Sequence, residues 1–269
     1  MHISMATSAG RTGRRNEDFV GAVPGAVVLL DGAGIPGMEA ICAHGVAWYT
    51  HRLGGVLLGR LTRHDEQAGP DLVTVLADAI DEIAGQHRET CDLAHPCSPQ
   101  ATVAIVRARD GRLDHLLLAD SHLVLDEAGV PRVLTDEREV AAKRATAAPL
   151  DGITPGTPEF DRVLAGCVGE LRARRNQPGG YWIAKEDPRA AEHAATGGHD
   201  VDGVDGVALL SNGATRLVSP YDVTDWAGIL ELLGTGGPHE VIRRVRQAEA
   251  GGDYDAPDDA TVAHWTGLR

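Results

Sequence analysis

Aromatic side chains are scarce in this sequence. Phe, Trp and Tyr make up 4% of the 269 residues, whereas all hydrophobic residues make up 43% and charged residues 24%. These proportions are ordinary for a globular chain that buries a sizeable core. Leucine, valine, isoleucine and alanine must therefore supply most of that core. The length allows one large domain or two small ones, and no repeat or low-complexity linker divides the chain.

Positive charge is also in short supply. The 39 acidic residues outnumber the 25 basic ones, which gives a formal net charge of −14. Such a surface repels the phosphate backbone of nucleic acids and anionic lipid headgroups, so we expect neither nucleic acid nor a membrane as a partner. The same charge suits divalent cations, provided that several carboxylates converge.

Long apolar runs and familiar cysteine or histidine motifs are absent as well. The longest apolar stretches, such as residues 26–30, suit a buried strand and are too short to span a bilayer. Residues 1–7 contain no apolar segment of signal-peptide length. The 12 histidines include no His-x3-His pair with a third ligand that would indicate a zinc site. We therefore expect a cytoplasmic protein.

The cysteines fit none of the common reactive or cross-linked patterns. The four of them are Cys42, Cys91, Cys97 and Cys167. They form no Cys-x-x-Cys pair, and none begins the Cys-x5-Arg pattern of the P-loop phosphatases. Cys91 and Cys97 are close enough in sequence to bridge in principle. Four cysteines in a chain of this length are more typical of buried thiols.

Apolar periodicity predicts strands in the first part of the chain and helices after them. Strands are expected at residues 2–9, 19–23 and 26–30. Apolar residues at helical spacing then predict long helices at residues 37–61 and 71–88, with Asp71 as the N-cap of the second.

The rest of the chain predicts more antiparallel strands and two further helix pairs. Strands at 101–109 and 113–119 flank Asp110-Gly111, a strong hairpin signal. With strands at 122–126 and 130–134 they are expected to form one antiparallel meander, because the connections are short. The remaining expected elements are helices at 160–175, 188–195, 223–233 and 238–250, strands at 207–210 and 260–265, and a flexible loop at 251–255. This order predicts an α+β domain of antiparallel sheets flanked by helices.

Acidic motifs recur where strands begin or end. They are Asn16-Glu17-Asp18, Asp31-Gly32-Ala33-Gly34, Asp120-Ser121 and Asp258-Asp259, and Ser211-Asn212-Gly213 occupies a related position. Any one of them is an ordinary turn. If these strand ends converge, however, the repulsion between the carboxylates requires a cation to offset it. Ligands that are all oxygen atoms favour Mg²⁺ or Mn²⁺ over zinc.

In order and spacing these motifs resemble those of the metal-dependent type 2C protein phosphatases, from about Asn16 to Thr261. The resemblance implies a four-layer α-β-β-α sandwich of two antiparallel sheets flanked by helices, with two Mn²⁺ or Mg²⁺ ions at one edge. It also implies that residues 1–269 are one such domain, with a variable flap at about 136–200. The implied activity is hydrolysis of phosphoserine or phosphothreonine by a metal-activated water.

The resemblance also assigns roles to individual residues. Asp31 would bridge both metals, and the Gly32 carbonyl with Glu17 or Asp18 would hold one of them. Asp258 and the residue at position 212 would hold the other, while Asp120 would serve a weaker third metal site. Asp31 and Asp120 would thereby take part in catalysis.

The sequence departs from the family pattern at three places. Position 212 is Asn where the family has Asp, so the metal site loses one negative charge. Asp205 lies seven residues earlier along the same strand and is expected to be too far away to compensate. Many relatives carry an arginine at the position of Gly13. His122 stands where the third motif of the family has Arg, and we interpret it as a strand residue.

Three neighbouring arginines offer a substitute at the second of these places. Arg11, Arg14 and Arg15 are near enough to supply a guanidinium fork for phosphate, with Arg14 and Arg15 as the preferred candidates. A solvated basic loop is the alternative interpretation of the same residues.

Three functions remain compatible with the sequence. The first is a metal-dependent phosphatase that acts on phosphorylated proteins, with activity reduced by Asn212. The second is a regulatory binding module that has lost catalysis, a pseudophosphatase. The third is a hydrolase of small phosphorylated metabolites, because fold resemblance alone does not fix the substrate.

Overall fold

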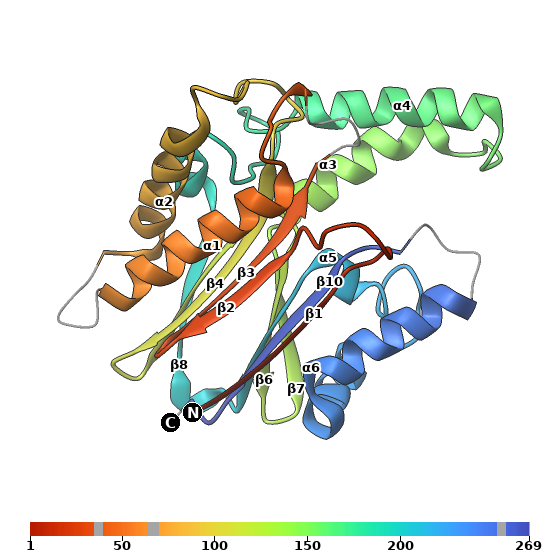
Figure 1. The fold of residues 1–269 in the computed structure, drawn as a ribbon. Helices are drawn as coiled ribbons and strands as arrows, with labels where there is room; N and C mark the ends of the chain where they lie inside the picture. The colour runs from red at the N-terminus through yellow and green to blue at the C-terminus, as the bar shows by residue number, and fades with distance from the viewer. Residues whose placement is uncertain (35–39, 64–69, 252–256, 269) are drawn as a thin grey trace.

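Two five-stranded antiparallel sheets pack face to face in the computed structural model, which describes residues 1–34, 40–63, 70–251 and 257–268 (Figure 1). The first sheet has the order β1 (His2–Ser8), β10 (Ala260–Thr266), β9 (Gly206–Leu210), β6 (His122–Glu127) and β7 (Val130–Leu134). The second has the order β2 (Phe19–Val23), β3 (Ala26–Ala33), β4 (Gln100–Arg109), β5 (Arg112–Leu118) and β8 (Ala195–Asp200).

Alternation along the strands divides the core into layers. In β3, Val27 and Leu29 point into the space between the sheets, where they join Leu209 and Trp265 of the first sheet. Val28 of the same strand points outward. This follows from the two-residue period of a strand, because both faces of the sheet are covered and both sets of side chains are apolar.

Helices cover the outer face of each sheet. The second sheet is covered by α1 (Val46–Arg63) and α2 (Leu72–His87), through side chains such as Leu53 and Ile80. The first sheet is covered by α6 (Trp226–Gly251), in which Ile229 and Val241 are fully buried. The predicted four-layer α-β-β-α sandwich is therefore confirmed.

The helix α6 contains a sharp break. Gly237 has a φ of 68° and a ψ of −170°, and Pro238 begins the second half. A proline fits the start of a helix because its missing N–H would have no partner there. The predicted pair of helices is confirmed as two halves joined at this break.

The segment between β7 and β8 is built mostly outside the sandwich. It contains α3 (Glu137–Ala147), the 3₁₀ turn η2 (Ala148–Leu150), α4 (Pro158–Ala173) and the 3₁₀ turn η3 (Pro188–His193). Figure 1 shows α3 and α4 projecting side by side from one end of the sheets. The sequence predicted α4 but neither α3 nor β8, and it placed a helix where η3 lies.

The predicted meander is wrong, because the chain changes sheet after β5. The hairpin of β4 and β5 lies in the second sheet, and that of β6 and β7 lies in the first. Both edges of β5 are already paired, by β4 and β8, so β6 pairs with β9 instead. Ala119, with a φ of 66°, starts the crossing.

Two predicted segments differ in extent from what the structure describes. The first long helix begins at Val46 rather than at residue 37, after a loop at 40–45 and a positive-φ Gly45. Residues 35–39 lie outside the described part of the chain, as do residues 252–255 of the predicted loop. A short 3₁₀ turn, η4 (Val201–Gly203), links β8 to β9.

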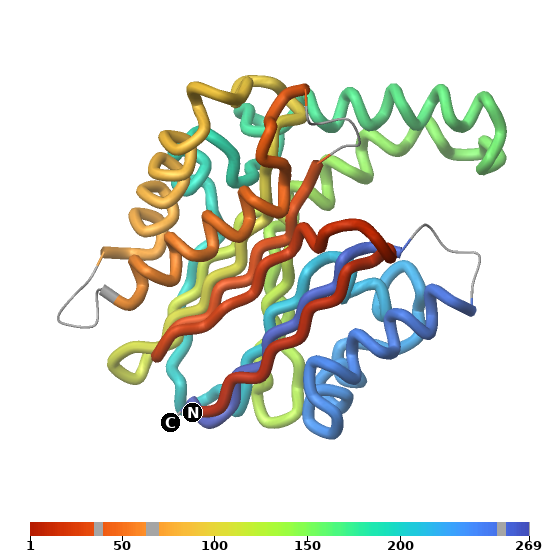
Figure 2. Tube along the Cα trace, in the orientation of Figure 1, coloured from red at the N-terminus to blue at the C-terminus, as the bar shows by residue number. Residues whose placement is uncertain are grey.

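The two ends of the described chain lie together. Residues of β1 pair antiparallel with β10 from His2 opposite Thr266 onward, and the Cα trace in Figure 2 shows both termini at the same end of the sandwich. Within the described residues, no helix combines the length and apolar character needed to cross a bilayer.

The N-cap of α2 is a direct test of the predicted local structure. Asp71 accepts a hydrogen bond from the Thr74 backbone N–H at 2.8 Å. We expect Asp71→Ala to lower the free energy of unfolding by about 1 kcal/mol, measured by urea denaturation. Asp81→Ala, which removes an exposed carboxylate 3.6 Å from Arg88 at the C-cap of the same helix, should change it by less than about 0.5 kcal/mol. Equal losses in the two variants would contradict the capping role.

Candidate active site

The acidic motifs meet at one end of the sandwich, and both sheets contribute to them. Asp18 directly precedes β2, and Asp31 lies within β3, opposite Thr102 of β4. Asp120 lies at the crossing between the sheets. Asn212 begins the short helix α5 (Asn212–Thr215) after β9, and Asp258 precedes β10. The sequence had placed Asp31 just after its strand, whereas β3 continues to Ala33.

Hydrogen bonds join these strand ends across the two sheets. The backbone N–H of Asn212 donates to Asp31 Oδ2 at 2.9 Å, and its side-chain Nδ2 donates to Asp120 Oδ2 at 3.0 Å. Asp259 accepts the backbone N–H of Gly10 at 2.8 Å and that of Glu17 at 2.6 Å. Residues from both sheets are therefore held within one site.

The backbones approach too closely for side chains at two glycines. A Cβ atom at Gly32 would collide with the carbonyl oxygen of Glu17, and one at Gly213 would collide with the carbonyl oxygen of Asp259. Glycine at these positions lets the first and second motifs, and the fourth and fifth, lie against each other. The close contact between Gly32 and Glu17 agrees with the predicted ligand set, in which both would bind the same metal ion.

The local electrostatics show that the carboxylates repel one another. Burial, and then the charges of Asp18, Asp120 and Asp258, raise the pKa of Asp31 well above its usual range, although the N–H of Asn212 opposes the rise. Burial is also the main reason that the pKa of Asp18 rises to about 7. Burial, followed by the charge of Asp259, raises the pKa of Glu17.

Asp18 is buried without a matching donor. It is 2% exposed, and neither of its carboxylate oxygens meets the geometry of a hydrogen bond with the described residues. The hydroxyls of Thr261 and Ser211 are near enough to counter part of the rise in its pKa. A buried carboxylate in this state is stabilised by a cation or by water bound to one. Asp18, Asp31 and Asp258 supply oxygen donors only, so this part of the site fits Mn²⁺ or Mg²⁺.

Asp120 has a lysine as its cationic partner. Lys143 of α3 places Nζ 2.5 Å from Asp120 Oδ2 and 3.2 Å from Glu139 Oε1. Partial burial opposes the charged form, but Asp120 and Glu139 raise the pKa of Lys143 above its usual value. The sequence did not predict Lys143, because α3 was not expected.

A small cleft of about 170 Å³ opens beside the acidic residues. Its lining consists of Arg11, Arg14, Arg15, Glu17, Arg216, Pro257, Asp258 and Asp259. The predicted arginine loop therefore lies beside Glu17 and Asp258, two of the predicted metal ligands. Arg216 was not predicted; it follows α5 and places a guanidinium nitrogen 2.8 Å from Asp258 Oδ2. In the sequence, only its position four residues after Asn212 connects it with the candidate site.

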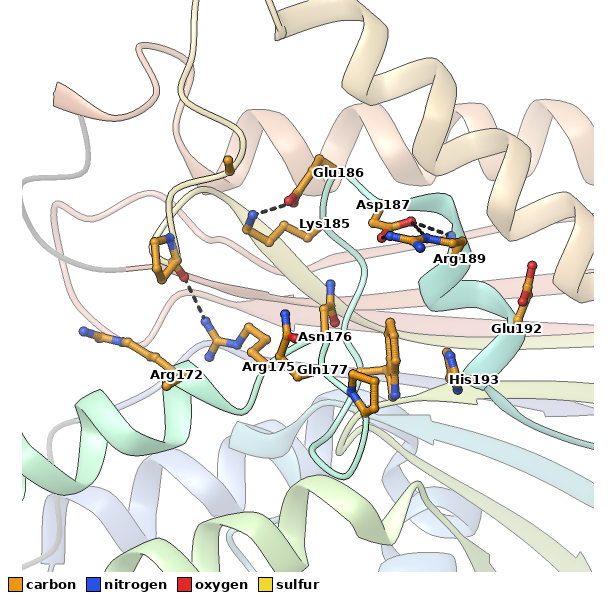
Figure 3. A pocket seen from close by; sticks show the side chains of 15 residues that line it. Arg172, Arg175, Asn176, Gln177, Lys185, Glu186, Asp187, Arg189, Glu192 and His193 are labelled. Carbon is orange, nitrogen blue, oxygen red and sulfur yellow. Dashed lines mark hydrogen bonds and ion pairs between the residues drawn. The ribbon is translucent and has the colours of Figure 1, made fainter.

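A larger cleft, of about 610 Å³, lies at the junction of the loop 94–96, the end of α4 and η3 (Figure 3). Its charges largely pair with one another: Lys185 with Glu186, and Arg189 with Asp187 at 2.6 Å. Among the described residues that line it, none is a predicted site residue. We therefore place the chemistry at the smaller, arginine-lined cleft.

Two secondary expectations agree with the structure. Asp205 donates its backbone N–H to Asp126 O at 2.8 Å, at the end of β9 opposite to Asn212, so it does not replace the missing carboxylate. His122 is a residue of β6 and stacks on Trp226, with ring centroids 5.2 Å apart.

The raised pKa values predict how pH affects the metal-free protein. The folded-state pKa of Asp18, about 7, lies above the ordinary 3.8, so the folded state binds protons more tightly than the unfolded state between these values. Its stabilising contribution is therefore complete at low pH and is lost as the pH rises through about 7. We expect Asp18→Asn to raise the unfolding free energy of chelator-treated protein near pH 8, by on the order of 2 kcal/mol.

The comparison between the two proteins isolates this effect. Burial lowers the pKa of His87 to about 4, which changes stability with pH in the opposite direction in both proteins alike. Thermal unfolding from about pH 5 to about pH 8 should show the wild-type protein losing stability relative to Asp18→Asn. Parallel pH profiles would contradict the raised pKa of Asp18.

No protein-family model matches this chain, and no curated protein matches it either. Solved structures do. The catalytic domain of the serine/threonine protein phosphatase PstP in complex with two manganese ions is 20% identical, with 98% of this chain and 96% of that chain covered and a TM-score of 0.58.

Two further structures give the same result. The serine/threonine phosphatase PstP/Ppp of Mycobacterium tuberculosis is 22% identical, covers 98% of this chain and 97% of its own, and has a TM-score of 0.60. Stp1 of Staphylococcus aureus is 15% identical, with 98% of this chain and 94% of that chain covered and a TM-score of 0.60. The resemblance seen in the sequence is thus confirmed at the level of fold: the chain has the fold of the bacterial type 2C serine/threonine phosphatases.

Proposed function

We propose that this protein is a metal-dependent phosphomonoester hydrolase that acts on phosphoserine and phosphothreonine in proteins. The observation that carries the proposal is the convergence of Asp18, Asp31 and Asp258 beside a cleft lined by arginines. The fold shared with serine/threonine phosphatases supports it, as does the complex of PstP with manganese. It would act on phosphorylated proteins in the cytoplasm. Residues 1–269 would form a single domain.

In this proposal the oxygen donors hold two ions of Mn²⁺ or Mg²⁺. Asp31 and the Gly32 carbonyl belong to one set, supported by Glu17 or Asp18, and Asp258 and Asn212 belong to the other. Bound divalent ions supply a water of lowered pKa as the nucleophile and positive charge that stabilises the phosphoryl oxygens. Asp31 would also contribute to the second set, and its carboxylate would then orient both groups of ligands.

The arginines bind and orient the phosphoryl group. Arg14 and Arg15 line the small cleft with Arg11 and Arg216, and planar guanidinium groups match phosphate oxygens in pairs. The volume of about 170 Å³ suits a phosphoryl group rather than a whole metabolite. This favours a phosphorylated side chain presented by a larger substrate, with the variable segment at 136–200 acting as a flap.

Two features of the site weaken its metal affinity. The side-chain oxygen of Asn212 offers a metal no negative charge. The side-chain Nδ2 of Asn212 already donates to Asp120. The ammonium of Lys143 occupies the same Asp120 oxygen at 2.5 Å. These contacts favour, as a second candidate function, a pseudophosphatase that binds phosphorylated partners without hydrolysing them.

Hydrolysis of p-nitrophenyl phosphate against a Mn²⁺ titration separates the two functions. We expect slow, Mn²⁺-dependent hydrolysis by the wild-type protein. Asn212→Asp should raise the rate and lower the Mn²⁺ requirement by roughly tenfold, because it restores a charged ligand. Asp31→Ala should abolish activity, whereas the exposed control Asp81→Ala should not change it.

The same variants decide the substrate class. Turnover of phosphoserine peptides at a higher kcat/KM than small phosphoesters supports the protein phosphatase. Preference for a small phosphoester would indicate the metabolite enzyme instead. No hydrolysis in any variant at saturating Mn²⁺ would refute a phosphatase and leave the pseudophosphatase.

The ion pair of Lys143 with Asp120 makes a separate prediction. Lys143→Met frees Asp120 and should lower the Mn²⁺ concentration for half-maximal activity by roughly two- to fivefold, the equivalent of a partly exposed ion pair. Arg144→Met, one residue further along α3 and exposed, is the matched control. An unchanged Mn²⁺ requirement in Lys143→Met would show that the ammonium does not compete with the metal.

A further inference from the structure

A second group of potential metal ligands lies around the loop that precedes α1 and the end of α2. Cys42, His44, His87 and Cys91 place one sulfur or nitrogen atom each within 4.8 Å of all the others. Cys42 and His44 belong to the loop before α1, His87 is the last residue of α2, and Cys91 follows that helix. Two segments that are 45 residues apart in sequence are thus brought together by side chains of types that can ligate metals.

The distances within this cluster are close to those of a tetrahedral site. The two sulfur atoms are 3.1 Å apart, His44 Nδ1 is 3.3 Å from Cys91 Sγ, and His87 Nδ1 is 3.7 Å from Cys42 Sγ. Four ligands at about 2.3 Å for sulfur and about 2.0 Å for nitrogen around one zinc ion lie roughly 3.3–3.8 Å from one another. A disulfide would require about 2.05 Å between the sulfurs, and both cysteines are free thiols.

The surroundings hold the four side chains in place. Cys42 and His87 are buried, and His44 and Cys91 are half-buried, so the ligands are shielded but reachable. Trp48 of α1 packs against both rings, with centroids 4.3 Å from His44 and 5.1 Å from His87. A backbone hydrogen bond of 2.9 Å from Asp92 N to Ile41 O ties the two loops directly.

We propose that Cys42, His44, His87 and Cys91 form a structural zinc site. Two sulfur and two nitrogen donors within 4.8 Å of one another select Zn²⁺ over the Mn²⁺ or Mg²⁺ that suits the oxygen donors at the end of the sandwich. All four positions come from the protein, which is the pattern of a closed structural site rather than a catalytic one.

The zinc would fix two loops that border functional parts of the molecule. The loop 40–45 leads to Val46, whose side chain packs against Gly32 in the candidate active site. The segment after Cys91 contributes Ala94 and Pro96 to the larger cleft, and its Leu93 carbonyl accepts a hydrogen bond from Lys185. One ion would thus anchor the loop 40–45 and a wall of that cleft.

Metal analysis of the full-length chain tests this assignment. Protein purified under reducing conditions, stripped of metal and reconstituted with zinc should retain one Zn²⁺ per chain after dialysis against a weak chelator, measured by plasma mass spectrometry. Cys91→Ser should lose this zinc. Cys97→Ser, six residues along the same loop, and Asp31→Ala, in the oxygen-only site, should both retain it.

Cobalt substitution identifies the ligands independently of metal content. Co²⁺ in the stripped wild-type protein should give thiolate-to-metal charge-transfer absorption and the intense visible bands of a tetrahedral ion. These features should disappear in Cys91→Ser and persist in Cys97→Ser and Asp31→Ala. Should Cys91→Ser fail to fold, Cys91→His decides, because it keeps four donors: zinc should be retained and the charge-transfer absorption weakened.

Three results would overturn the assignment. The first is reconstituted wild-type protein without tightly held zinc. The second is a cobalt spectrum that lacks charge-transfer absorption. The third is retention of a full equivalent of zinc by folded Cys91→Ser.

Discussion

Repulsion among carboxylates that the fold forces together is the constraint on which this structure depends. Asp18, Asp31, Asp120 and Asp258 come from separate strand ends, and their charges raise the pKa of Asp31. Burial of such groups destabilises a folded chain unless positive charge is present. The protein itself supplies part of that charge, through Lys143 at Asp120 and Arg216 at Asp258. The remainder, around Asp18 and Asp31, fits a divalent cation.

These internal cations place the protein between two extremes. A site fully offset by its own lysine and arginine would have no charge left to attract a metal. A site with only carboxylates would bind metals tightly but would destabilise the metal-free chain. The oxygens of Asp18 form no hydrogen bond with the described residues, which favours metal binding. Asp120 is already bound by both Lys143 and Asn212, which opposes metal binding.

Local signals predicted most of the fold, and contacts distant in sequence account for what they did not predict. The hairpin at Asp110-Gly111 and the cap at Asp71 each depend on a few adjacent residues, and both form. The change of sheet at Ala119 depends on β8, a polar edge strand with no apolar alternation that the sequence did not reveal. The residues that helix α3 buries are Glu139, Ala142 and Thr146, of which two are polar, so its apolar periodicity is weak.

The candidate site was predictable to a similar depth. Its acidic motifs are contiguous in sequence and adjoin recognisable strands, and the structure brings them together. Lys143 and Arg216 come from elements whose contacts only the folded chain defines. The cysteine and histidine cluster combines a Cys-x-His pair with a His-x3-Cys pair, and neither a Cys-x-x-Cys nor a His-x3-His pattern describes such mixed pairs.

The split origin of the acidic site couples it to the interface between the sheets. Asp18 and Asp31 are fixed to the second sheet, whereas Asn212 and Asp258 are fixed to the first. Apolar side chains such as Leu29, Leu209 and Trp265 pack between the sheets. They resist separation of the sheets but set their relative position less firmly than directional bonds do. The hydrogen bond from Asn212 to Asp31 is directional, so it acts as a latch that sets the alignment of the two sheets.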